Sequence, residues 1–143
     1  MAQDISENNL VVLTIPADYR LINVVGACIR TMLGQLDNQL IQEGLIYNIE
    51  LAVHETCTNI IEHAYAGSPG RIRVEARIVE SPPQLIITLH DTGHGFEMHE
   101  IQTPDPANPR TKGYGLFLVN TLMDEVFYHS NETSNHWQLV KNL

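Results

Sequence analysis

The chain is poor in basic residues: 8 lysines and arginines stand against 17 aspartates and glutamates, giving a net charge of -9 over 143 residues. Because nucleic-acid binding depends on clustered lysine and arginine, this balance argues against nucleic acid as the main partner. It also disfavours docking on anionic membranes. No apolar run approaches about 18 residues, so no transmembrane helix is expected. The polar N-terminus, MAQDISENN, is unlike a signal peptide, and we expect a cytoplasmic protein.

Cysteine is also scarce, with only Cys28 and Cys57 in the sequence. Both lie on apolar faces of helical patterns, so we predict two buried free thiols. The hydrophobic content of 43% and charged content of 17% are typical of a globular protein. The length fits one domain over residues 1–143, with residues 1–9 as a flexible N-terminus.

The hydrophobic pattern changes between helical and strand periods along the chain. Helices are predicted at Leu21–Leu36, at Leu45–Tyr65 after a break at Gly44, and at Tyr114–Asp124. Strands are predicted at Leu10–Ile15, Arg71–Val79, Leu85–His90, Val126–Ser130 and Trp137–Val140, the last two joined by a turn over 131–135. This order predicts an α+β two-layer sandwich, with helices on one face of a mixed, mostly antiparallel sheet.

The second helical segment, Leu51–Tyr65, reads LAVHETCTNIIEHAY and carries polar residues on a core-facing helix. Glu55, Asn59 and either Glu62 or His63 fall three or four residues apart, so they share one face. An Asn carbonyl oxygen can ligate Mg2+, and a carboxylate one turn away can accept a proton from a nucleophile. The polar face of an ordinary amphipathic helix would look the same, and the pattern taken alone favours that interpretation over a functional site.

The sequence DTGHGF, residues 91–96, follows the predicted strand that ends at His90. A carboxylate at a strand end, here Asp91, can accept a hydrogen bond from an exocyclic amine such as that of adenine. Gly93 and Gly95 allow the backbone to approach a ligand closely. A tight turn that uses Asp and Gly for backbone reasons is an equal alternative for this segment alone.

The segment Lys112–Gly115 opens the third predicted helix. Free backbone N–H groups and the positive end of the helix dipole make such a place suitable for phosphate, and Lys112 adds charge. A glycine-initiated helix after a long loop is the structural alternative. The preceding residues 97–112 lack periodicity, and loops of this length in compact domains are usually functional or mobile. The sequence contains no GxxxxGK[ST], which excludes a P-loop nucleotide site.

Taken together, the three segments occur in an informative order: ExxxN on a helix, DxGxG after a strand, a long loop, and GxG into a helix. This order resembles the ATP-binding fold shared by DNA gyrase, heat-shock chaperones, histidine kinases and mismatch-repair proteins. Within that fold, the segments AVHETCTNIIEHAY, DTGHGF and GYGLFLVNTLMDEV are similar to those of the bacterial anti-sigma-factor serine kinases. The likeness covers nearly the whole chain, from about Leu10 to Leu143.

The resemblance implies a role for each matching residue. Glu55 would be the general base, and Asn59 would bind Mg2+ that bridges the ATP phosphates. Asp91, with Gly93 and Gly95, would recognise the adenine amine, and residues 97–112 would form a lid. The remaining contacts would come from the phosphate-binding segment, namely Lys112, Gly113, Tyr114, Gly115 and Leu116.

By the same resemblance, the protein would be a Mg2+-ATP-dependent serine kinase that acts as an anti-sigma factor. Its substrate would be a serine on a small anti-sigma-factor antagonist, its other partner a sigma factor, and the family also suggests a homodimer. Two positions depart from the family pattern: Tyr114 stands where Arg is common, and Asn135-His136 stands where Gly-Thr is usual. These departures keep open a non-catalytic, ATP-dependent binding switch. A detached histidine-kinase catalytic module is disfavoured, because the ATP fold accounts for essentially the whole chain.

Overall fold

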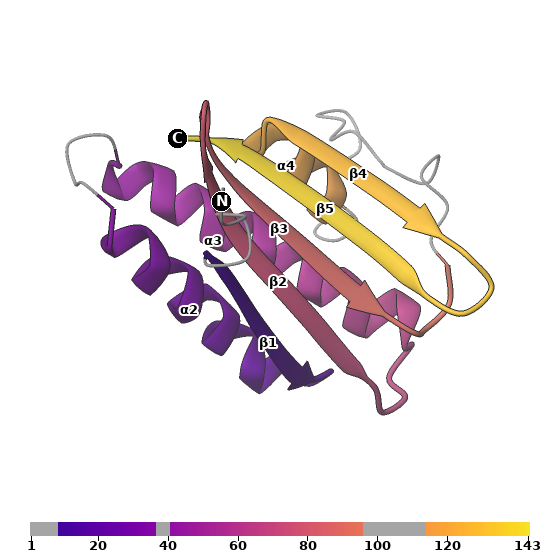
Figure 1. Cartoon of the computed structure of the whole chain (residues 1–143). Coiled ribbons are helices and arrows are strands. Elements are labelled where there is room, and N and C mark those ends of the chain that lie inside the picture. The colour runs from indigo at the N-terminus through magenta and orange to yellow at the C-terminus, as the bar shows by residue number, and fades with distance from the viewer. Residues whose placement is uncertain (1–8, 37–40, 96–113) are drawn as a thin grey trace, which may run out of the picture.

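The computed structural model describes residues 9–36, 41–95 and 114–143, which form one helical layer and one sheet (Figure 1). The strands are β1 (Leu10–Pro16), β2 (Arg71–Glu80), β3 (Pro83–Asp91), β4 (Glu125–Ser130) and β5 (Asn135–Asn142). The helices are α2 (Ile22–Gly34), α3 (Glu43–Asn59) and α4 (Gly115–Leu122), with a 3-10 turn η1 (Tyr19–Leu21) and a π-helical turn η2 (Ile60–Ala64). The α+β architecture expected from the sequence is confirmed.

The sheet has five strands in the order β1-β2-β3-β5-β4. Every pairing among these strands is antiparallel, so the expected mixed sheet is corrected to an antiparallel one over the described residues. The strand β3 lies at the centre, between β2 and β5. Its last residue, Asp91, pairs with Asn135 at the start of β5. Asn135 in turn pairs with Ser130 at the end of β4, so these three residues form one row across the sheet.

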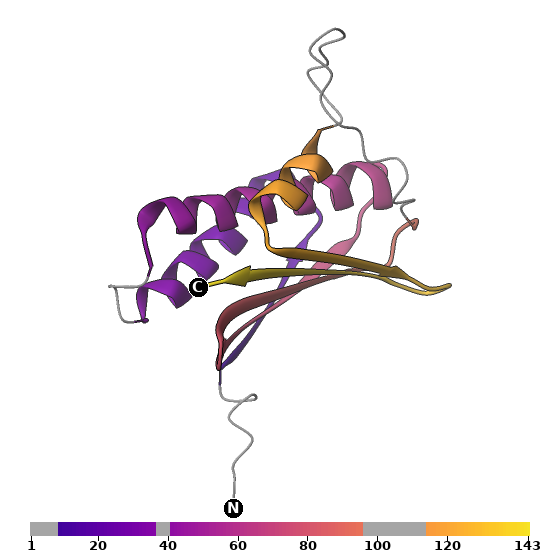
Figure 2. The same ribbon diagram turned by 90° about the horizontal axis from the view of Figure 1, so that it is seen from above.

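The helices α2, α3 and α4 all lie on one side of the sheet, as Figure 2 shows. The alternation predicted for β2 places Ile72, Val74 and Ala76 toward these helices, where all three are buried. The helix α3 packs between α2 and α4 and supplies fully buried residues such as Ile49 and Val53. Burial of this apolar surface is the main stabilising contribution, and it fixes α3 against the sheet.

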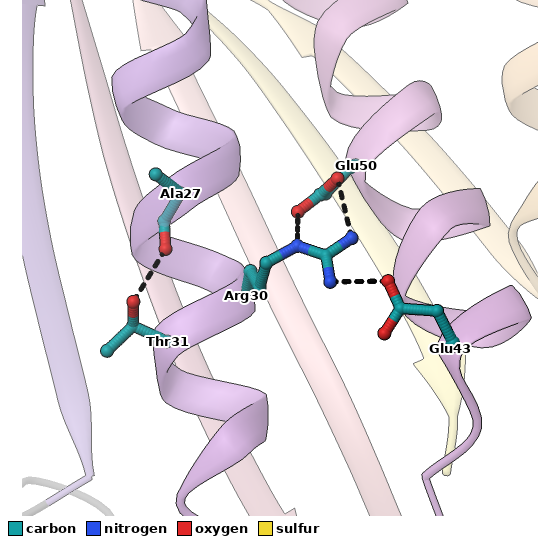
Figure 3. A network of polar contacts seen from close by, with 5 residues as sticks. All are labelled: Ala27, Arg30, Thr31, Glu43 and Glu50. Atoms are coloured by element: carbon teal, nitrogen blue, oxygen red, sulfur yellow. Dashed lines mark hydrogen bonds and ion pairs between the residues drawn. The ribbon is translucent and has the colours of Figure 1, made fainter.

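The helices α2 and α3 are also joined by an ion-pair network around Arg30 (Figure 3). The Arg30 guanidinium donates to both carboxylate oxygens of Glu50, at 2.6 and 3.2 Å, and also to Glu43. On the same helix, the Thr31 hydroxyl donates to the carbonyl of Ala27 at 2.9 Å. Glu43 and Glu50 both lie on α3, so the bidentate Arg30 contact helps to fix how the two helices pack.

The helix predicted at Leu45–Tyr65 differs from the structure at both ends. Gly44 does not break the helix, because α3 already begins at Glu43, before the glycine. A glycine in an exposed first turn destabilises a helix only slightly. The α-helix ends at Asn59, and the chain continues as a π-helical turn in which the Tyr65 N–H donates to the carbonyl of Ile60. Glu62 and His63, the two candidates for the third polar position, are both exposed, and His63 lines a small pocket together with Asn59 and Asp91.

Other expectations need smaller corrections. The turn predicted over 131–135 is shorter, because Asn135 already belongs to β5. Cys57 is buried as expected, but Cys28 is only half-buried; both thiols are free. Within residues 9–36, 41–95 and 114–143, no helix is long and apolar enough to cross a membrane. The predicted lid, residues 97–112, lies outside the described residues, as does the predicted N-terminal tail up to residue 8.

Candidate functional site

The polar face of α3 lies directly against the first residue of α4. An added Cβ on Gly115 would stand 2.8 Å from Oε2 of Glu55, and 3.5 and 3.7 Å from Nδ2 and Oδ1 of Asn59. Both polar side chains are half-buried, and Asn59 Nδ2 is buried with no hydrogen-bond partner among the described residues. An unpaired buried amide is costly, so this arrangement is typical of a site that a ligand completes. The structure thus brings Glu55, Asn59 and Gly115 together.

The start of α4 is the next part of the same site. Tyr114 is the N-cap residue of α4, and its carbonyl accepts a hydrogen bond from the N–H of Leu118. The side chain of Leu116 is buried in the core, so only its backbone N–H, in the first turn, is suited to phosphate. Lys112 and Gly113, the other predicted phosphate contacts, lie outside the described residues.

Asp91 is the most deeply buried carboxylate described, with 2% of its surface exposed. Its Oδ1 accepts hydrogen bonds from the Asn135 amide at 2.7 Å and from the Gly93 N–H at 3.0 Å. Its Oδ2 is buried and has no hydrogen-bond partner among the described residues. Burial raises the pKa of Asp91, while these two hydrogen bonds oppose the rise. One oxygen is therefore fixed by the protein, and the other is left without a hydrogen-bond partner among the described residues.

Two glycines hold the backbone after Asp91 close to its neighbours. A Cβ on Gly93 would lie 2.3 Å from the carbonyl oxygen of Ala64, and one on Gly95 would lie 2.8 Å from the hydroxyl of Ser130. The next N–H, that of His94, donates to the same Ala64 carbonyl at 2.7 Å. The glycines are therefore needed for close packing: Gly93 packs against the π-helical turn η2, and Gly95 packs against Ser130 at the end of β4.

One small pocket joins the two halves of the site. Its walls include Asn59 and Ile60 from the end of the first polar helix, Asp91 and His94 from the DTGHGF segment, and Trp137 from β5. Asn59 and Asp91 are 32 positions apart in sequence, yet they line the same cavity. Its lining is half polar, and the carboxylate of Asp91 among these residues is suited to accept a hydrogen bond from an amine.

Asn135 is the site residue that the sequence reasoning treated only as a departure. It is 1% exposed, and its amide nitrogen lies 2.7 Å from Asp91 Oδ1 and 3.0 Å from the Gly93 carbonyl. The alternating pattern of the last strand could have revealed this role. If that strand is extended back to residue 135, Asn135 falls on the same face as the buried Trp137, and in the structure it pairs with Asp91. Polar residues at that position suggested a turn instead.

Comparison with known families identifies the domain type. A family model described as the histidine kinase-like ATPase domain matches residues 15–141. A serine-protein kinase RsbW from Halalkalibacterium halodurans is 32% identical over 126 residues, covering 80% of this chain and 72% of that protein. One from Bacillus licheniformis is 36% identical over 90 residues, covering 57% of this chain and 55% of that protein. The resemblance noted in the sequence is confirmed.

Solved structures share the fold at lower sequence identity. The RsbU and RsbW domains of a Mycobacterium tuberculosis protein superpose with a TM-score of 0.68 at 20% identity, covering 94% of this chain and 32% of that one. The histidine kinase domain of a blue-light activated kinase from Erythrobacter litoralis gives a TM-score of 0.57 at 20% identity, covering 90% of this chain and 62% of that one. At such identities the likeness shows the fold alone.

Proposed function

The chain belongs to the histidine-kinase-like ATPase family, and from that premise we propose that it is a Mg2+-ATP-dependent protein serine kinase of the anti-sigma-factor type. The observation that carries this proposal is the free oxygen of Asp91 in a pocket that Asn59 also lines. The serine-protein kinases RsbW of 32–36% identity support the kinase assignment. Their name gives the activity of those proteins, and we transfer it here as a proposal.

In this proposal the pocket marks where the amine-bearing edge of the nucleotide base approaches Asp91. The buried Oδ2 of Asp91 accepts a hydrogen bond from the exocyclic amine of adenine, which would satisfy an oxygen that otherwise has no partner. Gly93 and Gly95 let the backbone after Asp91 pack closely against Ala64 and Ser130, which holds that segment beside the carboxylate. Asn59 would ligate Mg2+ through its amide oxygen, and the N-terminus of α4, from Gly115, would face the phosphates.

Glu55 is the proposed general base. It lies one helical turn before Asn59 and faces the N-terminus of α4, beside the place assigned to phosphate. Bound Mg2+-ATP supplies the phosphoryl group and neutralises its charge. Glu55 would accept the proton of the attacking serine hydroxyl, while the helix N-terminus and Asn59 hold the charged groups in position.

The proposed partners follow from the family. The substrate would be a serine on a small anti-sigma-factor antagonist in the cytoplasm, and the second partner a sigma factor that the protein sequesters. A non-catalytic, ATP-dependent switch is the second candidate, supported by Tyr114 at a position where the family commonly has Arg. Both candidates need the nucleotide site, and they differ in whether Glu55 transfers a proton.

The test has two stages. Titration calorimetry should show ADP binding that strengthens with Mg2+, and Asp91→Asn should weaken it strongly, whereas the exposed-site control Glu132→Gln should not. Transfer of labelled γ-phosphate to a co-purified partner should then fall about 10²–10⁴-fold in Glu55→Gln, the usual cost of losing a general base. Unchanged ADP binding in Asp91→Asn would remove the proposed pocket. Binding without any transfer by the wild type would favour the switch.

A further inference from the structure

Asn135 has all its polar atoms engaged around the proposed base pocket. Its amide nitrogen lies 2.7 Å from Asp91 Oδ1, 3.0 Å from the Gly93 carbonyl and 3.2 Å from the His94 carbonyl. Its carbonyl oxygen accepts a hydrogen bond from the Ser130 hydroxyl at 2.6 Å. These partners fix the amide orientation, because the reverse orientation would turn its oxygen toward a carboxylate and two carbonyls.

The direction of these hydrogen bonds determines what Asp91 can offer a ligand. Asn135 donates to Oδ1, so that oxygen must act as an acceptor and cannot carry a proton along this contact. The Gly93 N–H donates to the same oxygen. Only Oδ2 remains without a partner among the described residues, and Asp91 is one of the residues that line the pocket. The other titratable side chains that line it are the same in wild type and in the Asn135 variants, namely His63, His94 and Tyr128. An ionised carboxylate accepts hydrogen bonds only, whereas a protonated one can also donate.

We infer that Asn135 is a positioning residue that holds Asp91 as a fixed hydrogen-bond acceptor and so selects a base with an exocyclic amine over one with a carbonyl at that position. This inference rests on the proposed nucleotide site. Asn135 does not itself touch the base; it acts through Asp91 and through the backbone at Gly93 and His94. It stands where the family usually has glycine, so the arrangement belongs to this chain rather than to the family pattern.

The electrostatics of the site also indicate that Asn135 keeps Asp91 in its ionised, accepting form. Burial raises the pKa of Asp91, and the Asn135 amide is the strongest opposing contribution, with smaller ones from the Gly93 N–H and from His136 and His90 on the other face of the sheet. Without the amide, Asp91 would bind a proton at higher pH. It could then donate to the carbonyl of hypoxanthine, which carries an oxygen where adenine carries its amine.

The experiment compares ADP with inosine diphosphate, in the presence of Mg2+, by calorimetry over a series of pH values from about 4, where an ordinary carboxyl group titrates, up to about 8. Asn135→Leu removes the amide at similar volume. We expect the preference for ADP over inosine diphosphate to fall roughly tenfold or more, the size of losing one hydrogen bond to a charged group. The loss of ADP affinity on acidification should also begin at a higher pH in this variant than in wild type. The control Gln138→Leu, which also replaces an amide side chain of β5 by leucine but on the outer face of the sheet, should change neither the preference nor the pH dependence.

A second variant keeps the test decisive if Asn135→Leu does not fold. Asn135→Asp preserves size but places a carboxylate against Asp91, and two such groups ionise together only with difficulty. The Asn135→Asp variant should lose its affinity for ADP near pH 8 and regain it as the pH falls. At lower pH one proton is shared between the two carboxyl groups, so residue 135 can again donate a hydrogen bond to Asp91 Oδ1.

The outcomes separate the inference from the function on which it rests. If wild type binds ADP through Asp91, but the Asn135 variants weaken both nucleotides equally and leave the pH profile unchanged, Asn135 has only a structural role and the inference fails alone. If wild type binds neither nucleotide, the proposed function fails and the inference fails with it.

Discussion

Glu55 and Gly115 approach so closely that a Cβ atom on residue 115 would lie 2.8 Å from Oε2 of the glutamate. The contact joins the end of α3 to the start of α4, two elements that are far apart in sequence. Glycine at this position therefore leaves room for the carboxylate proposed as the general base. A side chain here would displace that carboxylate, and this is the basis of the first prediction.

Gly115→Ala should reduce phosphoryl transfer about 10–100-fold, the cost of misplacing a catalytic group by about 1 Å. The fold should persist, because alanine favours helix more than glycine does and the Glu55 side chain can rotate away. The measurement is the transfer rate together with the melting temperature. Gly44→Ala, also in a helix and with no atom near the added Cβ, is the matched control and should leave transfer intact. Normal transfer in Gly115→Ala would show that the Glu55 position is not critical.

The stability of the protein should fall as the pH drops below about 6.5, in part because of His90. Burial and the neighbouring His136 lower the pKa of His90 below its ordinary value of 6.5, while Glu75 and Asp91 act in the opposite direction and Arg73 adds to the lowering. The folded state therefore binds this proton less readily than the unfolded chain, so stability present above pH 6.5 is lost as the pH falls through the lowered pKa.

In His90→Gln this part of the acid destabilisation should disappear, whereas a matched His129→Gln change at an exposed position of β4 should leave it in place. Denaturant unfolding at several pH values measures the difference. Identical pH dependence in wild type and His90→Gln would refute the assignment.

The two cysteines should differ sharply in reactivity. Burial raises the pKa of the Cys57 thiol to about 12, so almost no thiolate is present at neutral pH. Cys28 is half-buried on α2 and is the more accessible thiol. A thiol reagent should therefore modify one cysteine in the native protein and two in denaturant, and Cys28→Ser should abolish the native reaction. Rapid modification of Cys57 in the native state would contradict the described packing.

The central strand should be sensitive to truncation on its helix-facing side only. Ile87 on β3 is fully buried beneath the helices, and Ile87→Ala should lower the free energy of unfolding by about 2–5 kcal/mol. The adjacent Ile86 points to the opposite face and is half-buried, so Ile86→Ala should cost clearly less. Equal losses for both variants would mean that the outer face of the sheet is covered in solution.

Much of the fold was predictable because the hydrophobic period is a local property. The alternation at Ile72, Val74 and Ala76 fixed the inner face of β2, and the helical stripe of α2 fixed its buried side. The glycines after Asp91 and the polar pair Glu55 and Asn59 were likewise visible as short patterns. Local patterns could not predict the distances between these residues, because those distances depend on how the helices pack on the sheet.

The element ends were less predictable, since they depend on partners elsewhere in the chain. Asn135 resembles a turn residue in sequence, but pairing with Asp91 and Ser130 places it in a strand. The helix end at Asn59 was likewise not visible in the sequence, because the apolar spacing continues through Ile60, Ile61 and Ala64 into the π-helical turn.

The sequence by itself determined the alternation of the strands, the buried side of the helices and which residues could carry chemistry, because these follow from side-chain type and spacing. Only the tertiary structure decided that Glu55 meets Gly115, and that Asn135 holds one oxygen of Asp91 and leaves the other free. The reason is physical: a side chain's type is set by its own position, but its partners are set by the packing of segments distant in the chain.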